Sequence, residues 1–351
     1  MIYNVPSFAY FSLAFTNAKR CIEFLTAESV LPVRSVCICG GQMKPVTGKF
    51  RMLRCGNWRC RRSCSRTKNT FFSSKLPPQT LLMIVYHWLL GSTYTVIKQW
   101  TGCSSSTICG WFNLLNYVVQ LHLEMQRHMI GGPGVIVEID ESKFGKRKYH
   151  RGHRVEGVWV VGGVERTPER RLFAVAVMDR RAPTLEALIR RYVHPGSIII
   201  TDCWKGYRTA ALNRMGMEHF TVNHSRGFVN PETGADTNTI EGTWCGMKQV
   251  IPKRYRNWKF ISGHLAKFVW RRQYAHCLWE AMIEAMQWWA RDMEPNPDED
   301  EEQEREEEEE EHPGSDESID SVSDDSESDL SDSDDDSTVA AGWDAELYFL
   351  Y

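Results

Sequence analysis

The sequence predicts an α/β protein with smaller modules before the sheet and an acidic segment after it. Strand-like and helix-like stretches alternate between residues 133 and 292, a pattern typical of an α/β sheet. Five of the 11 cysteines lie between Cys37 and Cys64, and residues 298–338 hold 23 acidic residues and one arginine. A chain of 351 residues is long enough to bury one sizeable core beside such attachments.

The net charge of −3 conceals a basic and an acidic part of the chain. Residues 298–338 carry a net charge of −22, whereas residues 1–297 hold 41 basic and 20 acidic residues, a net charge of +21. The basic part suits a polyanionic partner. Because the acidic part has few apolar residues, we expect a disordered tail over residues 293–338, with a short terminal segment at 339–351. The tail is either a solubilising or phosphorylated segment or a site for a basic protein partner.

The first 15 residues are apolar, but they lack the basic start and the cleavage site of a secretory signal. No later run of 18 apolar residues occurs. We therefore expect neither secretion nor a membrane partner, and we expect an intracellular protein.

The amino-terminal side is predicted to contain a short helix at residues 16–30 and a metal-binding module at 31–72. Cys37 and Cys39 are separated by one residue, and Cys60 and Cys64 by three. Four thiolates from two such clusters can close a tetrahedral Zn²⁺ site, so we predict a zinc-ribbon-like module with these ligands. Cys55 is a further candidate ligand. Buried reduced cysteines are the alternative, although this polar, arginine-rich segment has little core in which to bury them.

Residues 76–130 are predicted to form a helix-turn-helix-like region. Apolar, helix-like stretches cover residues 79–90, 93–100 and 104–129, and a Thr-Gly-Cys turn separates the last two. Ser104 is a suitable N-cap for the last helix. This spacing is typical of a DNA-binding pair of helices, but a plain three-helix packing unit would look the same.

Residues 133–292 are predicted to form the main domain. Its first strand is a β-branched run that ends at Asp140, and a later strand ends at Asp202. The remaining elements are expected as strands at 157–164, 172–178 and 220–223 and helices at 184–192, 204–215 and 238–250. This order of elements is compatible with an RNase H-like fold.

Three carboxylates in this domain are candidate metal ligands. Sixty-one residues lie between Asp140 and Asp202, and 38 lie between Asp202 and Glu241, which begins the helix at 238–250. Hard divalent cations take oxygen ligands, and a pair of such ions can hold both the attacking and the leaving oxygen of a phosphodiester. The set therefore predicts Mg²⁺, or Mn²⁺ as a substitute, at a phosphoryl-transfer site.

A series of ordered motifs between Cys37 and Trp279 resembles the Merlin superfamily of DDE transposases and its bacterial insertion-sequence relatives. The motifs are IDESKFG at 139–145, HRGH at 150–153, WVVGGVER at 159–166, PGS at 195–197, ITDCWKGY at 200–207, VNHS at 222–225 and TNTIEGTWCGMK at 237–248. The resemblance implies an RNase H-like catalytic core in which Asp140, Asp202 and Glu241 are the three catalytic acids. The sequence departs from the family's pattern at Asp236, at Gly242 and in the tight spacing of Cys37 and Cys39.

The resemblance also implies a function. It predicts an endonuclease that cuts DNA at transposon ends and joins the freed 3′ end to target DNA, acting as a homo-oligomer on DNA, in the nucleus if the host is eukaryotic. Its double-stranded DNA partners would be terminal inverted repeats and target DNA. The alternatives are a domesticated descendant that binds DNA without transposition, and a nuclease without strand transfer.

DNA contacts are expected from basic residues near the predicted acids. Lys248 follows Glu241 by two helical turns and should share its face, within reach of a phosphate. Asn238 is expected to cap this helix rather than to orient Glu241, and Trp244 to lie in the core. His150, His153 and His224 are either phosphate contacts or structural histidines. The other predicted DNA-binding residues are Lys143, Lys146, Arg147, Lys148, Arg151, Lys253 and Arg254, although a solvated loop would also explain the run from Lys143 to Arg154.

Overall fold

A computed structural model describes residues 5–33, 36–145, 157–222 and 236–292. The chain divides into two compact units, residues 1–293 and 294–351, and the described residues all belong to the first. The predicted acidic tail lies outside them. No helix among the described residues is both long enough and apolar enough to cross a bilayer.

The short helix predicted at 16–30 is confirmed as α2 (Ala18–Ala27), and a second helix that was not predicted, α1 (Phe8–Thr16), precedes it. Asn17 separates the two helices: its backbone is extended, and its side chain accepts a hydrogen bond from the Arg20 N–H to cap α2. Both helices pack on α3 (Pro78–Leu90), which is buried along nearly its whole length. With α5 (Ser105–Met125) and α10 (Leu278–Asp292), these helices form the largest hydrophobic core of the described residues.

The three helices predicted between residues 79 and 129 are confirmed, with α4 (Tyr94–Thr101) as the middle one. Gly102 adopts the left-handed conformation that ends α4, and the Ser104 hydroxyl then accepts a hydrogen bond from the Thr107 N–H. Ser104 is therefore the predicted N-cap. Ile97 and Ile108 pack with Ile84 of α3 in a small separate cluster, which fixes the α4–α5 turn on α3.

A small antiparallel sheet follows α2 in the sequence. It consists of β1 (Met43–Val46), β2 (Lys49–Cys55) and β3 (Ser63–Ser65), with β2 in the middle. The Arg51 guanidinium of β2 donates hydrogen bonds to the carbonyl oxygens of Ser74 and Leu76, at 2.5 and 3.2 Å. These bonds tie the small sheet to the segment that leads into α3.

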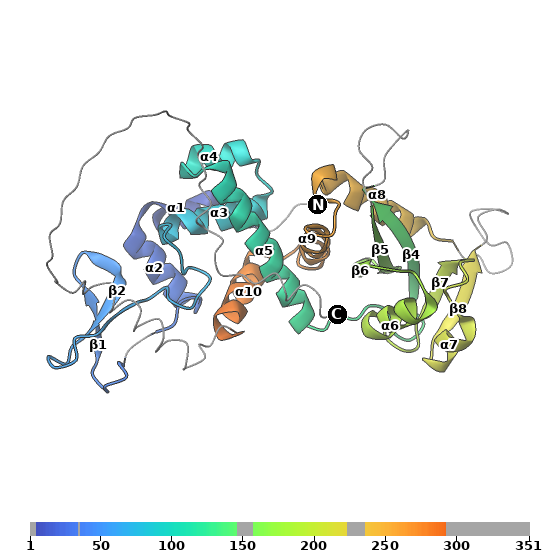
Figure 1. The fold of residues 1–351 in the computed structure, drawn as a ribbon, viewed down its shortest axis with the longest axis horizontal. Coiled ribbons are helices and arrows are strands. Elements are labelled where there is room, and N and C mark those ends of the chain that lie inside the picture. The colour runs from blue at the N-terminus through green and yellow to red at the C-terminus, as the bar shows by residue number, and fades with distance from the viewer. Residues whose placement is uncertain (1–4, 34–35, 146–156, 223–235, 293–351) are drawn as a thin grey trace, which may run out of the picture. The chain divides into compact units, whose positions relative to one another are not determined.

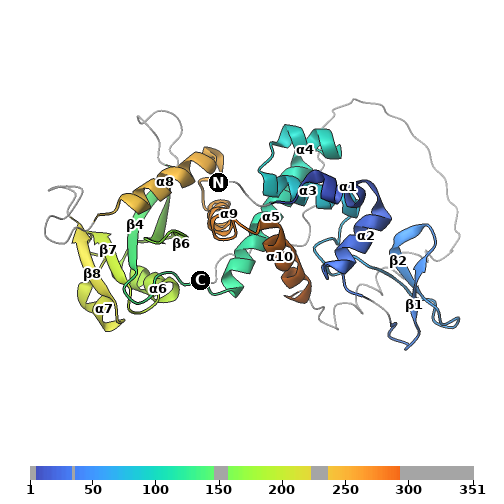
Figure 2. The same ribbon diagram turned by 180° about the vertical axis from the view of Figure 1, so that it is seen from behind.

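A five-stranded mixed sheet forms the main domain (Figures 1 and 2). Its strands lie in the order β6-β5-β4-β7-β8; β4, β5 and β6 are antiparallel neighbours, while β7 and β8 run parallel to β4. The strand bounds are β4 (Ile136–Phe144), β5 (Val158–Glu165), β6 (Leu172–Val177), β7 (Ile198–Asp202) and β8 (Glu218–Val222). This arrangement confirms the mixed α/β class predicted from the alternating elements.

Helices cover both faces of this sheet. On one face, α6 (Ala182–Tyr192) and α7 (Thr209–Arg214) pack on Val137, Ile139 and Val161. On the other face, α8 (Asn238–Val250) and α9 (Ile261–Gln273) pack on alternate strand residues such as Val160 and Val164. A short 3-10 turn, η1 (Lys253–Tyr255), joins α8 to the segment before α9.

Two predicted boundaries were wrong. Strand β4 continues past Asp140 to Phe144, because β5 supplies hydrogen-bonding partners along its whole length, including Gly162 opposite Asp140. The helix predicted at 204–215 begins only at Thr209. The residues between Asp202 and Thr209 instead form a turn that the Asp202 carboxylate begins by accepting the Trp204 N–H at 2.9 Å.

Candidate active site

Asp140 and Asp202 lie side by side on neighbouring parallel strands. The register pairs Val137 with Ile199 and Glu138 with Ile200, so two residues further along each strand Asp140 is level with Asp202. Side chains alternate along a strand, and Asp140 therefore shares the face of Glu138 and Phe144, which α8 covers. The predicted convergence of these two aspartates is thus built into the pairing of β4 with β7.

Glu241 is brought to the same face by the first turn of α8. The buried carboxylate of Glu138, two residues before Asp140, accepts the Ile240 N–H at 2.9 Å. An acidic group is stabilised at a helix amino terminus, where N–H groups lack partners within the helix. This hydrogen bond docks the start of α8 directly on β4.

Arg166 completes the attachment of α8. Its guanidinium lies 2.5 Å from the Glu138 carboxylate and 2.9 Å from that of Asp236, which precedes the helix. The Asp236 carboxylate also accepts the Asn238 N–H at 3.1 Å. Asp236, one of the departures from the family pattern, is therefore part of the structure that sets the position of Glu241. A Cβ at Gly242 would meet nothing within 4 Å, and nothing in the structure explains that departure.

The predicted N-cap role of Asn238 was wrong. Thr237 is the cap residue and Asn238 is the first residue of α8, because Asp236 accepts the Asn238 N–H before the helix begins. The Thr237 hydroxyl donates a hydrogen bond to the Glu241 carboxylate at 3.4 Å. Thr237, rather than Asn238, is thus the residue that contacts Glu241.

Trp244 connects the core to Asp140. The predicted core position is confirmed, since only 5% of the side chain is exposed, and its Nε1–H donates a hydrogen bond to Asp140 Oδ2 at 3.0 Å. The indole lies over Gly162, the β5 partner of Asp140, where an added Cβ would come within 2.6 Å of Trp244 Cη2. A glycine at this position is therefore required for the indole to reach Asp140.

Burial and charge act together on Asp140. Desolvation raises its pKa, the neighbouring Asp202 and Glu241 carboxylates raise it further, and hydrogen bonds from the Glu141 backbone and Trp244 lower it in part. These carboxylates are close enough for their charges to interact. A bound cation would relieve both the desolvation and the repulsion.

Lys248 lies two turns beyond Glu241 on the same face of α8, as predicted. Its Nζ donates a hydrogen bond to Ser142 Oγ at 2.6 Å and lies 5.3 Å from the centre of the Phe144 ring. Burial lowers the pKa of Lys248, with a further contribution from the nearby Arg256. The positive charge of Lys248 thus lies beside Ser142, two residues after Asp140 on β4, whereas Glu138 lies two residues before Asp140.

The sequence predictions missed Glu141, which follows Asp140 and must point to the opposite face of the sheet. Its side chain is buried, accepts a hydrogen bond from the Tyr207 hydroxyl and lies 3.4 Å from Arg180 Nη1. Burial raises the pKa of Glu141. The sequence did offer a signal for Glu141: an acidic residue within a strand whose other side chains are largely buried needs a hydrogen-bonding or charged partner.

Four cysteines form a compact cluster beside the small sheet. Their sulfur atoms all lie within 4.8 Å of one another, with Cys37–Cys60 at 3.7 Å and Cys39–Cys55 at 3.5 Å. Tetrahedral zinc with Zn–S bonds of about 2.3 Å places its sulfurs about 3.8 Å apart. The cluster is therefore compatible with zinc, and a hydrogen bond from the Gly41 backbone helps to lower the pKa of Cys39 to about 7.

The group of four contains Cys37, Cys39 and Cys60 of the predicted ligands, together with the further candidate Cys55 in place of Cys64. Cys55 and Cys60 flank one turn, just as Cys37 and Cys39 flank another. Cys64 lies on β3 opposite Leu53 and is outside the group of four. The pairing of β2 with β3 decides this choice, which cysteine spacing left open.

The structure describes only some of the other predicted DNA-binding residues. Lys143 lies on β4 with its Nζ 5.5 Å from the centre of the Trp159 ring, and Lys253 and Arg254 are exposed in η1. The others, together with the three histidines, lie outside the described residues: Lys146, Arg147, Lys148, His150, Arg151, His153, Arg154 and His224.

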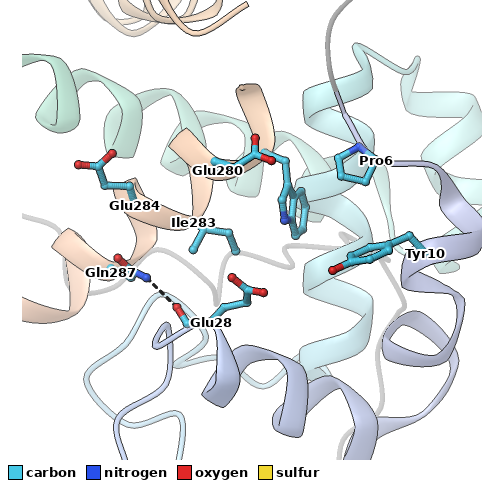
Figure 3. Close-up of a pocket in the computed structure, with 8 residues that line it drawn as sticks. Pro6, Tyr10, Glu28, Glu280, Ile283, Glu284 and Gln287 are labelled. Carbon is cyan, nitrogen blue, oxygen red and sulfur yellow. Dashed lines mark hydrogen bonds between the residues drawn. The ribbon is translucent and has the colours of Figure 1, made fainter. Parts of the chain in front are cut away.

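A pocket of about 270 Å³ lies elsewhere, against α1, α2 and α10 (Figure 3). Glu28, Glu280 and Glu284 are among its lining residues, and the Gln287 side chain donates a hydrogen bond to the Glu28 carbonyl. None of the elements that carry the three predicted acids contributes to it. Its acidic lining disfavours a polyanionic ligand.

Comparison with known proteins concerns the same part of the chain. Residues 129–273 match the family model of the ISXO2-like transposase domain. The matched segment contains the whole five-stranded sheet, helices α6 to α9, and Asp140, Asp202 and Glu241. No curated protein matches the chain. The segment that brings the three carboxylates together is therefore similar to the transposase domains of insertion sequences.

Proposed function

We propose that the chain is a DDE transposase of the Merlin type, in which Asp140, Asp202 and Glu241 catalyse metal-dependent cleavage and joining of DNA. One observation carries the proposal: β4, β7 and α8 bring these carboxylates to one face of the sheet, within the segment similar to transposase domains. The strand order β6-β5-β4-β7-β8, with β6 to β4 antiparallel and β7 and β8 parallel to β4, supports an RNase H-like core.

The three carboxylates suit Mg²⁺ or Mn²⁺, because carboxylate oxygens are the ligands these hard ions prefer. The charges of Asp202 and Glu241 both act on Asp140, and a pair of ions can share such carboxylate ligands between them. When bound, such ions would activate the attacking water or 3′-hydroxyl and stabilise the leaving oxygen.

The protein's own residues set the geometry of this reaction. Trp244 orients Asp140, and Thr237 contacts Glu241 at the start of a helix that Glu138 and Arg166 hold on β4. Lys248 supplies a positive charge beside the carboxylates for a DNA phosphate. The +21 charge of residues 1–297 supports duplex DNA as the substrate, bound by a zinc-ribbon-like module at 31–72 and a helix-turn-helix-like region at 76–130.

The proposal is tested by cleavage of a transposon-end duplex in Mg²⁺. Asp140→Ala, Asp202→Ala and Glu241→Ala should each abolish cleavage while duplex binding persists, because each removes a metal ligand and not a docking surface. Glu218→Ala is the matched control, since Glu218 is an exposed carboxylate at the opposite end of the parallel strands from Asp202. Cleavage that survives any of the first three changes would remove that residue from the catalytic set. Binding without cleavage by the unmodified protein would favour a domesticated DNA-binding protein.

A further inference from the structure

Aromatic and cationic side chains alternate in a stack beside Asp202. The Trp204 ring centre lies 4.7 Å from the Arg180 guanidinium carbon, which lies 3.6 Å from the centre of the Trp159 ring. Lys143 adds a second cation to Trp159, with its Nζ 5.5 Å from the centre of that ring. Trp204 forms its outer end, with 43% of the side chain exposed. We call these four residues the cation–aromatic stack.

Hydrogen bonds hold the stack in place from several sides. The Trp204 backbone N–H binds Asp202 Oδ1 at 2.9 Å, and the Trp204 indole N–H donates to the Arg180 carbonyl oxygen at 3.3 Å. The Arg180 guanidinium is itself held by the buried Glu141 carboxylate. A Cβ at residue 206 would come within 2.7 Å of Trp204 Nε1, so Gly206 leaves the space that the indole occupies.

Packing does not account for the exposed indole. Trp204 contributes to none of the hydrophobic clusters of the described residues, and its polar N–H already has a partner. Its ring nevertheless lies on the Arg180 guanidinium, and the next residue in the chain is the exposed Lys205. Exposed aromatic rings among cationic side chains are typical of surfaces on which nucleobases stack.

We propose that Trp204, supported by Arg180, stacks on an unpaired base of the DNA strand whose phosphodiester lies at Asp140 and Asp202. The base must be unpaired or extruded, because neighbouring base pairs cover both faces of a base within a duplex. The inner part of the stack lies on the α6/α7 face of the sheet, opposite Asp140. Trp204 follows the end of β7, where its backbone N–H binds the Asp202 carboxylate, so a base on this ring belongs to a nucleotide near the reacting phosphate. The location of that phosphate rests on the proposed function.

The test compares the affinities of the full chain for two end duplexes without added divalent ion. One duplex is fully paired, and the other carries an unpaired 2-aminopurine at the cleavage site. The unmodified protein should bind the unpaired duplex about 10-fold more tightly and quench its fluorescence, as expected for one stacked base. Trp204→Ala should remove both the preference and the quenching, while Trp204→Phe, which keeps an aromatic face, should retain part of each.

Trp258→Ala is the matched control, because Trp258 is a tryptophan of similar exposure, 46%, outside the stack. It should leave the ratio of the two affinities unchanged. Retention of the preference and the quenching in Trp204→Ala would overturn the proposal. The outcome is separable from catalysis. If the unmodified protein cleaves through Asp140 but shows no preference for the unpaired duplex, only the stacking role is refuted. If it shows the preference but never cleaves, only the transposase activity is refuted.

Discussion

Gly162 provides a sharp test of how Asp140 is positioned. A methyl group at this residue would lie 2.6 Å from Trp244 Cη2 and 3.0 Å from the Phe173 carbonyl oxygen. The first contact is impossible without movement and the second is tight, and the indole is the group that can move. We therefore expect Gly162→Ala to displace Trp244 and to break its hydrogen bond to Asp140.

The neighbouring residue supplies a matched control. A methyl group at Gly163 would lie 2.5 Å from Phe173 Cε1, an equally severe overlap on the opposite face of the sheet, away from Asp140. Overpacking of this kind costs about 1–3 kcal/mol of unfolding free energy in either variant. A hydrogen bond to a charged acceptor contributes about 1.5–3 kcal/mol, which corresponds to roughly 10- to 100-fold in rate if the transition state needs it. This second loss should occur in Gly162→Ala alone.

Two measurements separate these effects. Urea denaturation should show the overpacking loss in both variants and a loss at least as large in Gly162→Ala as in Gly163→Ala, whereas cleavage of an end duplex in Mg²⁺ should fall at least about 10-fold further in Gly162→Ala. Equal cleavage rates at equal stability would refute the idea that Trp244 positions Asp140.

Three further predictions concern charge and metal. Because burial raises the pKa of Asp140, its contribution to stability is present below the unfolded pKa of about 3.9 and is lost as the pH rises through the higher folded value. Metal-free Asp140→Asn should therefore resist urea better than the unmodified protein at neutral pH, with a difference that shrinks in acid; lower stability at neutral pH would contradict this. Metal analysis should find one zinc per chain, lost in Cys55→Ala and kept in Cys64→Ala, and the reverse pattern would restore Cys64 as the ligand. Truncation before Asp298 should tighten duplex binding most at low salt, because the −22 segment competes with DNA for the basic surface; equal affinities would instead favour a separate basic protein as its partner.

The sequence by itself determined the elements that depend on local pattern. Helix α8 has the predicted bounds because Ile240, Trp244 and Met247 recur at helical spacing and Pro252 follows. The isoleucine run of β7 likewise predicts a buried strand that ends at Asp202. Ser104 was recognisable as a cap because capping depends on a residue only three positions away.

The tertiary structure decided what depends on residues far apart in the chain. Asp140 lies inside a strand because β5 pairs with β4 beyond it. Cys55, and not Cys64, joins the cluster of four thiols because the pairing of β2 with β3 determines which cysteines come together. Glu141 has a hydrogen bond and an ion pair because Tyr207 and Arg180 reach it from other parts of the chain. The hydrogen bond from Trp244 to Asp140 joins residues 104 positions apart. The periodicity of apolar residues along one segment cannot predict such contacts, because they form only when strands pair and helices pack on the sheet.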